Sequence, residues 1–352
     1  MSRDNDKRKS ICFFTLYTDK GASSKYRIIQ FREDLEKKYD TKWFNFWNDK
    51  YTEEYINNKK KYIVQIVTIY LISAIKRIYQ LLFIAPKYDI VFIQKTIIPK
   101  NKNTFLSRIK KRNRRIIYDV DDAVYEEPSS NSDNIAEKSD LIICGNQILR
   151  NHYKKINNKC IVIPTIDNTK LYPRYWKNTF DNKIIGWIGS KSTINNLDLI
   201  IKPLKQIIEN DKRVHLRIIC SDTYGYENKI DNIEFVKWDK TNYLKSLSDI
   251  TIGIMPLYDT SFNRGKCGFK LIQYLSLKKP VIASDVGVNK TIVKDCGLIA
   301  HNESEWGMAI KTLLYDEKQY NKMSDNIENS FLSVYGYDVI YDKLTTAIEA
   351  IK

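Results

Sequence analysis

Short, almost uniformly apolar runs alternate with amphipathic helical patterns along the chain, and this alternation limits the fold more than any other feature. The first five runs are Ile11–Tyr17, Ile90–Gln94, Ile116–Tyr118, Leu141–Cys144 and Cys160–Ile163. Runs of this kind suit strands that are buried on both faces of a parallel sheet, because crossover helices cover both faces. The sequence therefore predicts an α/β fold with doubly wound parallel sheets.

The alternation occurs twice, separated by a polar stretch at Leu171–Lys183 that contains Pro173. The second series of predicted strands is Ile184–Ile188, Leu216–Cys220, Ile233–Val236, Ile250–Met255, Val281–Ala283 and Leu298–Ala300. A chain of 352 residues exceeds what one hydrophobic core usually organises. We therefore expect two domains, residues 1–177 and 178–335.

Two helices of the second half are predicted by their apolar spacing. Apolar residues recur every three or four positions from Leu197 to Ile208, after the potential caps Ser192 and Thr193. A second apolar stripe runs from Val339 to Ile348 and must dock on another surface. We expect residues 336–352 to form a C-terminal helix that packs back on the N-terminal domain.

The charge is concentrated in the first half of the chain. Residues 1–180 contain 35 Lys/Arg and 20 Asp/Glu, whereas the remaining residues contain 23 and 22. The strong positive charge of the first half favours polyanionic partners, such as nucleic acid, an anionic membrane surface or phosphorylated substrates. The densest stretch, Lys100–Arg115, contains eight Lys/Arg ahead of an apolar strand. It could equally be a solvated helix face.

Cysteine spacing and the first residues bear on the compartment. The six cysteines form no C-x-x-C pair, and residues 1–10 are charged with no secretory signal pattern after them. A reducing cytoplasm is expected. The apolar segment Tyr62–Ala85 approaches the length of a membrane span, but Lys76 and Arg77 interrupt it. This pattern favours an amphipathic core helix or an interfacial helix over a spanning one.

The segment Asp249–Asn289 carries the most informative motif, a strand, a loop, a helix and a second strand. Gly268 stands where the helix begins, so the free N–H groups of the first turn face the loop. Arg264, Lys266 and Lys270 add cationic donors around that point. Together they suit a diphosphate leaving group, which develops charge as its bond to a sugar breaks. A solvated surface charge is the alternative for each residue taken alone.

The order of these motifs resembles the GT-B glycosyltransferases, specifically the retaining family 4, also called glycosyl transferases group 1. The resemblance rests on G-I-M-P-L, G-K-C-G-F-K-L-I-Q-Y-L and K-K-P-V-I-A-S. The segment from S-D-L-I-I-C-G to Pro173 is similar to the family's approach to its interdomain linker. The resemblance implies two Rossmann-like domains facing a cleft, a nucleoside diphosphate sugar donor on the second domain, no cofactor and no metal.

The resemblance also implies donor contacts. The G-W-I-G-S turn implies backbone contacts from Gly189 and Ser190 to the donor phosphate, with Gly268 and Phe269 at the helix start. We place Trp238 near the nucleotide base.

One part of the family pattern differs in this chain. The family usually has two glutamates eight positions apart around this helix, and the matching residues are Gly265 and Gln273. Gln273 retains the capacity to hydrogen-bond the ribose, and Asp259 is the candidate for sugar contact.

A second candidate cluster, Asp119, Asp121 and Asp122, follows the strand Ile116–Tyr118. A D-x-D metal site is one interpretation, which ranks low because no other acidic or histidine cluster accompanies it. Ligands bind beyond the carboxyl ends of strands in open α/β sheets, so acceptor binding or proton acceptance ranks higher, with Asp122 as the leading candidate. The structural alternative is loop capping and pairing with Arg112–Arg115.

Near the N-terminus, G-A-S-S-K-Y-R follows the first strand and is similar to the S-S-x-x-R opening of this transferase subgroup. Ser24 and Arg27 could hold an acceptor phosphate at this turn. An ordinary helix cap is equally consistent with the residues.

Several classes are disfavoured. The three histidines lack metal-ligand spacing, and neither a G-x-S-x-G turn nor a Walker motif is present. The sequence predicts a metal-independent, retaining glycosyltransferase of bacterial surface polysaccharide synthesis, such as capsule or lipopolysaccharide, cytoplasmic and possibly peripheral on the membrane. The alternatives are a nucleic-acid-binding protein, an epimerase and an inactive GT-B scaffold.

Overall fold

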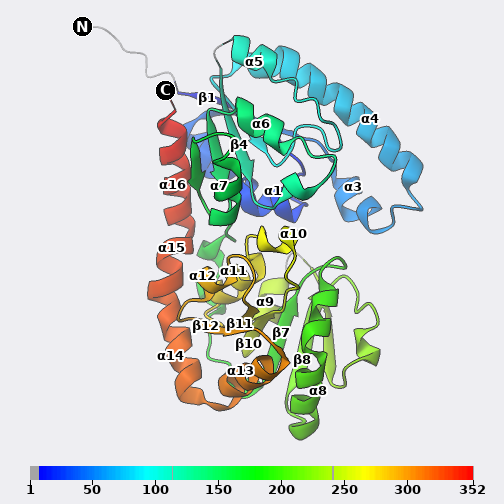
Figure 1. Cartoon of the computed structure of the whole chain (residues 1–352), viewed down its shortest axis with the longest axis vertical. Coiled ribbons are helices and arrows are strands. Elements are labelled where there is room, and N and C mark those ends of the chain that lie inside the picture. The colour runs from blue at the N-terminus through cyan, green and yellow to red at the C-terminus, as the bar shows by residue number, and fades with distance from the viewer. Residues whose placement is uncertain (1–7, 113, 240–241, 352) are drawn as a thin grey trace. The chain divides into compact units, whose positions relative to one another are not determined.

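The computed structural model describes residues 8–112, 114–239 and 242–351. The chain divides into two compact units (Figure 1). One unit ends at Thr165 and also contains the segment that starts at Tyr341, and the other is Ile166–Ile340.

The first unit is built on a six-stranded parallel sheet with the order β2-β1-β3-β4-β5-β6. Its strands are β1 (Ser10–Thr15), β2 (Asp40–Asn45), β3 (Ile90–Gln94), β4 (Arg115–Val120), β5 (Leu141–Cys144) and β6 (Cys160–Val162). The chain proceeds outward from β1 in one direction and from β3 in the other. The topological switch point therefore lies between β1 and β3, where ligands of open α/β sheets bind.

The second unit repeats this plan with the strand order β12-β11-β10-β7-β8-β9, again all parallel. Its strands are β7 (Ile184–Ile188), β8 (His215–Cys220), β9 (Ile233–Lys237), β10 (Ile252–Met255), β11 (Val281–Ser284) and β12 (Gly297–Ala300). Its switch point lies between β7 and β10. The predicted fold class, two doubly wound parallel α/β domains, is confirmed.

Helices connect the strands throughout both units. Those of the first unit are α1 (Ala22–Arg27), α2 (Arg32–Lys38), α3 (Asp49–Glu53), α4 (Ile63–Tyr79), α5 (Ser107–Lys111), α6 (Ser132–Lys138) and α7 (Gln147–Tyr153). The later helices are α8 (Ile201–Asn210), α9 (Tyr243–Ser248), α10 (Ser261–Arg264), α11 (Phe269–Ser276), α12 (Asn289–Val293), α13 (Glu303–Tyr315), α14 (Glu317–Ile327), α15 (Ser333–Tyr335) and α16 (Tyr337–Glu349).

Alternation along the strands of the second sheet creates a core on each face. Ile185 and Trp187 of β7 belong to the cluster under α8 and α13, whereas Ile184 and Ile188 belong to the cluster under α9 and α11. The central strands are therefore buried on both sides, as their apolar runs predicted.

Two elements differ from the sequence predictions. Strand β2 was not predicted, because it is an edge strand with the half-exposed sequence DTKWFN rather than an apolar run. The predicted helix at Leu197–Ile208 is a 3₁₀ segment at Ile194–Ile200 followed by α8. Pro203 explains the change, because its ring and missing N–H are tolerated only in the first turn of an α-helix.

The last helix, α16, continues from the second unit into the first. Tyr341 Oη donates a hydrogen bond to the Asp34 carbonyl at 3.0 Å, and Lys9 Nζ lies 2.8 Å from a Glu349 carboxylate oxygen. The predicted linker Leu171–Lys183 lies in the sequence between β6 and β7, and it consists mainly of 3₁₀ turns.

Candidate functional site

The start of helix α11 is the central feature of the candidate site in the second unit. Gly268 is the residue before the helix and has φ +67°, a left-handed conformation that glycine adopts without strain. A Cβ at this position would also lie 2.4 Å from Ile292 Cδ1. Lys270 lies in the first turn, where backbone N–H groups have no intrahelical acceptor. The turn therefore presents positive charge from both the backbone and a side chain.

Two lysines lie close together around this helix start. Lys270 Nζ is 5.5 Å from the centre of the Trp187 ring, and Lys266 Nζ is 4.7 Å from the centre of the Phe262 ring. Burial, together with the neighbouring Lys266 ammonium, lowers the pKa of Lys270 to about 8. Two ammonium groups that repel each other in a partly desolvated place would both be stabilised by an anion.

Arg264 and Asp259, predicted for separate roles, form a pair with each other. Arg264 Nε and Nη2 donate to the two Asp259 carboxylate oxygens at 2.6 and 2.8 Å, and both side chains are exposed. The hydrogen bonds from Arg264 lower the pKa of Asp259. In the described structure, the Arg264 guanidinium therefore has a carboxylate partner.

The turn after β7 contains Gly189 and Ser190. The Gly189 N–H donates to the Ile219 carbonyl at 3.1 Å, and the Ser190 N–H donates to Thr193 Oγ1 at 3.2 Å. Both backbone donors predicted for the donor phosphate thus have partners within the protein.

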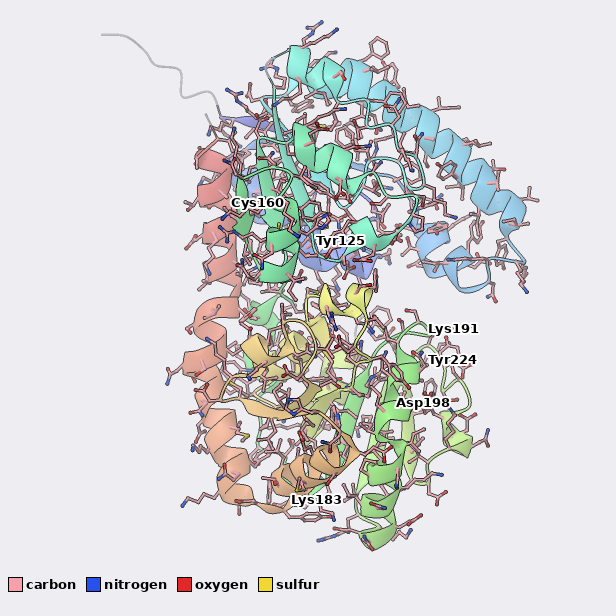
Figure 2. The ribbon with its side chains drawn as sticks, viewed as in Figure 1. Tyr125, Cys160, Lys183, Lys191, Asp198 and Tyr224 are labelled. Atoms are coloured by element: carbon pink, nitrogen blue, oxygen red, sulfur yellow. The ribbon has the colours of Figure 1, made fainter. Side chains whose placement is uncertain are left out.

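A cation that the sequence reasoning missed follows this turn. Lys191 Nζ lies 5.5 Å from the centre of the Tyr224 ring, in the loop after β8, and Figure 2 shows the two side chains near each other. Strand order could have indicated this pairing, since β7 and β8 are neighbours.

Gln273, predicted to contact the ribose, is buried and directed toward an acid. Its Nε2 is 3.4 Å from Asp167 Oδ2, which also accepts hydrogen bonds from Tyr172 Oη at 2.6 Å and from Tyr243 Oη at 3.0 Å. Asp167 was not singled out from the sequence, because it lies 106 positions before Gln273. Trp238 follows β9, is 41% exposed and has its ring centre 6.1 Å from that of Tyr243.

The first unit contains a buried ion pair between Arg27 of α1 and Asp119 of β4. Arg27 Nε lies 2.9 Å from both Asp119 carboxylate oxygens, and Arg27 Nη1 donates to the Ile163 carbonyl. Both side chains are almost completely buried. Arg27 and Asp119, which the sequence analysis assigned to acceptor binding, therefore tie α1 to the sheet.

Ser24 is fully buried at the switch point of the first sheet. Its Oγ donates to Gln94 Oε1 at 2.8 Å and accepts a hydrogen bond from the Tyr17 N–H at 3.0 Å. Gln94 Oε1 also accepts from the Leu16 N–H. Hydrogen bonds of the buried Ser24 and Gln94 side chains thus hold the loop between β1 and α1.

Asp122, which follows β4, pairs with a lysine and not with the arginines of the structural alternative. Asp122 Oδ2 lies 2.8 Å from Lys95 Nζ. Arg114 and Arg115 instead lie 3.2 and 3.9 Å from Asp89 and Asp140. The alternative pairing of this cluster with Arg112–Arg115 is therefore wrong for Arg114 and Arg115, because they lie at the opposite, amino end of β4.

Asp121 is the least satisfied member of this cluster. It is nearly fully buried, and its Oδ1 has no hydrogen-bond partner in the described structure. Burial and, to a smaller degree, the Asp122 charge raise the pKa of Asp121 to about 6, against the opposing charges of Lys95 and Arg27. Within the described residues, no group of three or more His, Cys, Asp or Glu side chains is placed to share a metal ion.

Comparisons with known proteins match part of the chain to a family model. Residues 182–316 match the model of the family described as glycosyl transferases group 1. No curated protein sequence matches the chain.

Solved structures resemble the chain over nearly its whole length. HepE of Anabaena in complex with UDP and glucose is 14% identical, with 97% of this chain and 100% of that chain covered at a TM-score of 0.65. The lipopolysaccharide outer core galactosyltransferase WaaB is 13% identical, with 97% and 99% covered and a TM-score of 0.65. Sucrose-phosphate synthase from Thermosynechococcus elongatus is 14% identical, with 97% and 98% covered and a TM-score of 0.67.

The chain therefore has the GT-B fold. Its resemblance to the glycosyl transferases of group 1 is confirmed by the match over residues 182–316, which contain Lys266 and helix α11 with Lys270.

Proposed function

We propose that this protein transfers a sugar from a nucleoside diphosphate donor to a glycan or a lipid-linked acceptor during bacterial surface polysaccharide synthesis in the cytoplasm. The observation that carries the proposal is the pair Lys266 and Lys270 at the glycine-started helix α11, within the part of the chain that matches glycosyl transferases group 1. UDP and glucose in the structure of HepE, and the name of WaaB, support a sugar nucleotide as donor.

In the proposed reaction, the bond between the anomeric carbon and the diphosphate oxygen breaks, and an acceptor hydroxyl oxygen bonds to that carbon. The leaving diphosphate gains negative charge. The first-turn N–H groups of α11 and the two ammonium groups stabilise it, and one such preorganised donor typically contributes about 3–4 kcal/mol. Because fixed cations supply this stabilisation, the proposed reaction needs neither a metal nor a cofactor. Retention of configuration is part of the proposal through the family resemblance.

We assign acceptor binding and proton acceptance to Asp121 and Asp122, which follow β4. Lys95 holds Asp122 in place, and Asp121 retains an oxygen without a hydrogen-bond partner in the described structure. A carboxylate at this edge can accept the proton that the acceptor hydroxyl loses.

The test is isothermal titration of the purified protein with UDP, GDP and ADP, and with their sugars. We expect one nucleotide class to bind, and Lys270→Met to weaken its binding about tenfold or more, as loss of a charge-assisted contact does. Lys205→Met, at an exposed position on α8, is the matched control and should bind normally. Failure of all the nucleotides to bind would contradict the proposal. Sugar-nucleotide conversion without any acceptor would indicate an epimerase instead.

A further inference from the structure

Helix α4 and the π-helical turn η3 (Gln80–Ile84) present an apolar stripe to solvent. Of the fifteen exposed large hydrophobic residues among the described residues, eight lie on this segment. They are Ile63, Val64, Val67, Leu71, Ile72, Ile75, Tyr79 and Phe83. Six of them, from Val64 on, follow one another at steps of three or four, so they share one face of the helix. Soluble surfaces rarely expose so continuous an apolar patch without a partner.

The opposite face of the same helix is fastened to the first sheet by Arg77. This side chain is 1% exposed, and its Nη2 donates to the Thr15 carbonyl at 3.1 Å and to the Phe44 carbonyl at 3.2 Å. Its guanidinium also lies 4.7 Å from the centre of the Phe14 ring. Tyr70, about two helical turns before Arg77, donates a hydrogen bond to the Pro99 carbonyl at 2.7 Å. One face of α4 is thus packed on the first unit, and the other face is exposed to solvent.

Cations surround the stripe. The sequence from Lys59 to Arg115 contains fifteen Lys/Arg and a single carboxylate, Asp89. Exposed lysines stand immediately before α4 at positions 59–61 and after η3 at Lys87. Helix α5, which carries Lys111 and is followed by Arg112, packs beside η3 (Figure 1). The side chain of Arg108 lies outside the described residues. So many like charges favour an anionic surface.

The segment Ile63–Lys87 is long and apolar enough to cross a membrane, with 11% of its apolar window buried. A span would pull Arg77 out of its contacts with β1 and β2 and place Lys76 and Arg77 in hydrocarbon. An in-plane position leaves Arg77 where it is and exposes only the apolar stripe to lipid. A second copy of the chain would bring the two sets of cations against each other, so self-association is disfavoured.

We propose that α4 and η3 dock this protein flat on an anionic lipid bilayer, with the apolar stripe inserted at the headgroup boundary and the surrounding lysines and arginines on the lipid phosphates. Interfacial helices of this composition bind through their buried apolar area and their attraction to anionic lipids. This inference does not depend on the proposed transferase activity, since it concerns no residue of the α11 site.

The experiment is co-sedimentation of the full chain with vesicles of phosphatidylcholine alone and of phosphatidylcholine with phosphatidylglycerol. We expect binding to the mixed vesicles that weakens with salt and is much lower on phosphatidylcholine alone. Val64→Glu with Ile75→Glu, at positions 71% and 70% exposed, should lower the partition coefficient by at least about tenfold. Gln206→Glu with Met308→Glu changes the charge equally at exposed positions of the second unit and should bind like the wild type.

Four results would overturn the proposal. Two of them are unchanged binding of the Val64/Ile75 variant and equal binding to both vesicle types. The third is retention of the protein in the membrane pellet after alkaline carbonate, which would indicate a membrane span. The fourth is a dimer that forms without lipid and dissociates in this variant, which would indicate that a second copy covers the stripe. Hydrogen exchange on the wild type needs no variant. Vesicles should slow exchange in 63–84, and unchanged exchange there would equally contradict docking through α4.

Discussion

Arg27 and Asp119 form a buried ion pair across 92 positions of sequence, with Arg27 Nε 2.9 Å from each carboxylate oxygen. The pair joins the first helix of the chain to the fourth strand, and the guanidinium also reaches the Ile163 carbonyl next to β6. Burial raises the pKa of Asp119, and the Arg27 charge opposes that rise. A buried carboxylate in this position depends on its cation, so the pair predicts a large effect of removing one partner.

We expect Arg27→Met to lower the free energy of unfolding by about 3–5 kcal/mol, because Asp119 would remain buried without its cation. Denaturant unfolding monitored by circular dichroism measures the change. The matched control is Arg32→Met, which removes an exposed pair with Glu36 and should cost less than about 1 kcal/mol. Adding Asp119→Asn to Arg27→Met should recover part of the loss, and a double variant no more stable than the single one would contradict this explanation.

Asp121 predicts a pH dependence of stability. Its folded-state pKa is about 6, above the ordinary 3.8. The folded state therefore binds more protons than the unfolded state between these two values, and stability falls as the pH rises through that window. The shift corresponds to about 3 kcal/mol, an order-of-magnitude figure. Asp121→Asn removes this contribution, so the variant should gain stability relative to wild type from about pH 4 to about pH 6. Parallel stability curves for the two proteins would refute the assignment.

Lys270 predicts that nucleotide binding depends on pH. Because its pKa is lowered to about 8, the ammonium loses its proton as the pH rises through that value. Affinity for the bound nucleoside diphosphate should therefore fall from about pH 7 to about pH 9, and binding near pH 8 should take up protons. Titrations in buffers of different ionisation enthalpy measure that uptake. In Lys270→Met both effects should disappear, and their persistence would assign them to another group.

Replacing Gln273 distinguishes a structural role of this side chain from a contact with the ribose. Its side chain is buried and directed toward Asp167, so Gln273→Leu should lower the free energy of unfolding by about 1–2 kcal/mol through the lost hydrogen bond. We expect its affinity for the nucleotide to stay within about threefold of wild type, because the Gln273 amide is directed toward Asp167 inside the protein. A loss well beyond that, measured by the same titration, would restore the ribose contact that the sequence suggested.

Strands were predictable where burial is complete. Ile90–Gln94, Leu141–Cys144 and Ile184–Ile188 have the predicted bounds, because strands covered on both faces are apolar at nearly every position. Strand β2 lies at a sheet edge, half exposed, and so carries no such run. The start of α8 was predicted too early, because the apolar periodicity begins at Leu197, whereas Pro203 must lie in the first turn of the helix.

By itself the sequence determined the two doubly wound sheets, the glycine-started helix at Gly268 and the lysines around it, because these follow from periodicity and from residues close in the chain. Only the tertiary structure decided which charges pair. Arg27 with Asp119, Lys95 with Asp122 and Gln273 with Asp167 join segments 27 to 106 positions apart. It also decided that the apolar stripe of α4 faces outward. Local sequence specifies which residues can be buried, whereas the packing of distant elements specifies which face is covered and which partner is within reach.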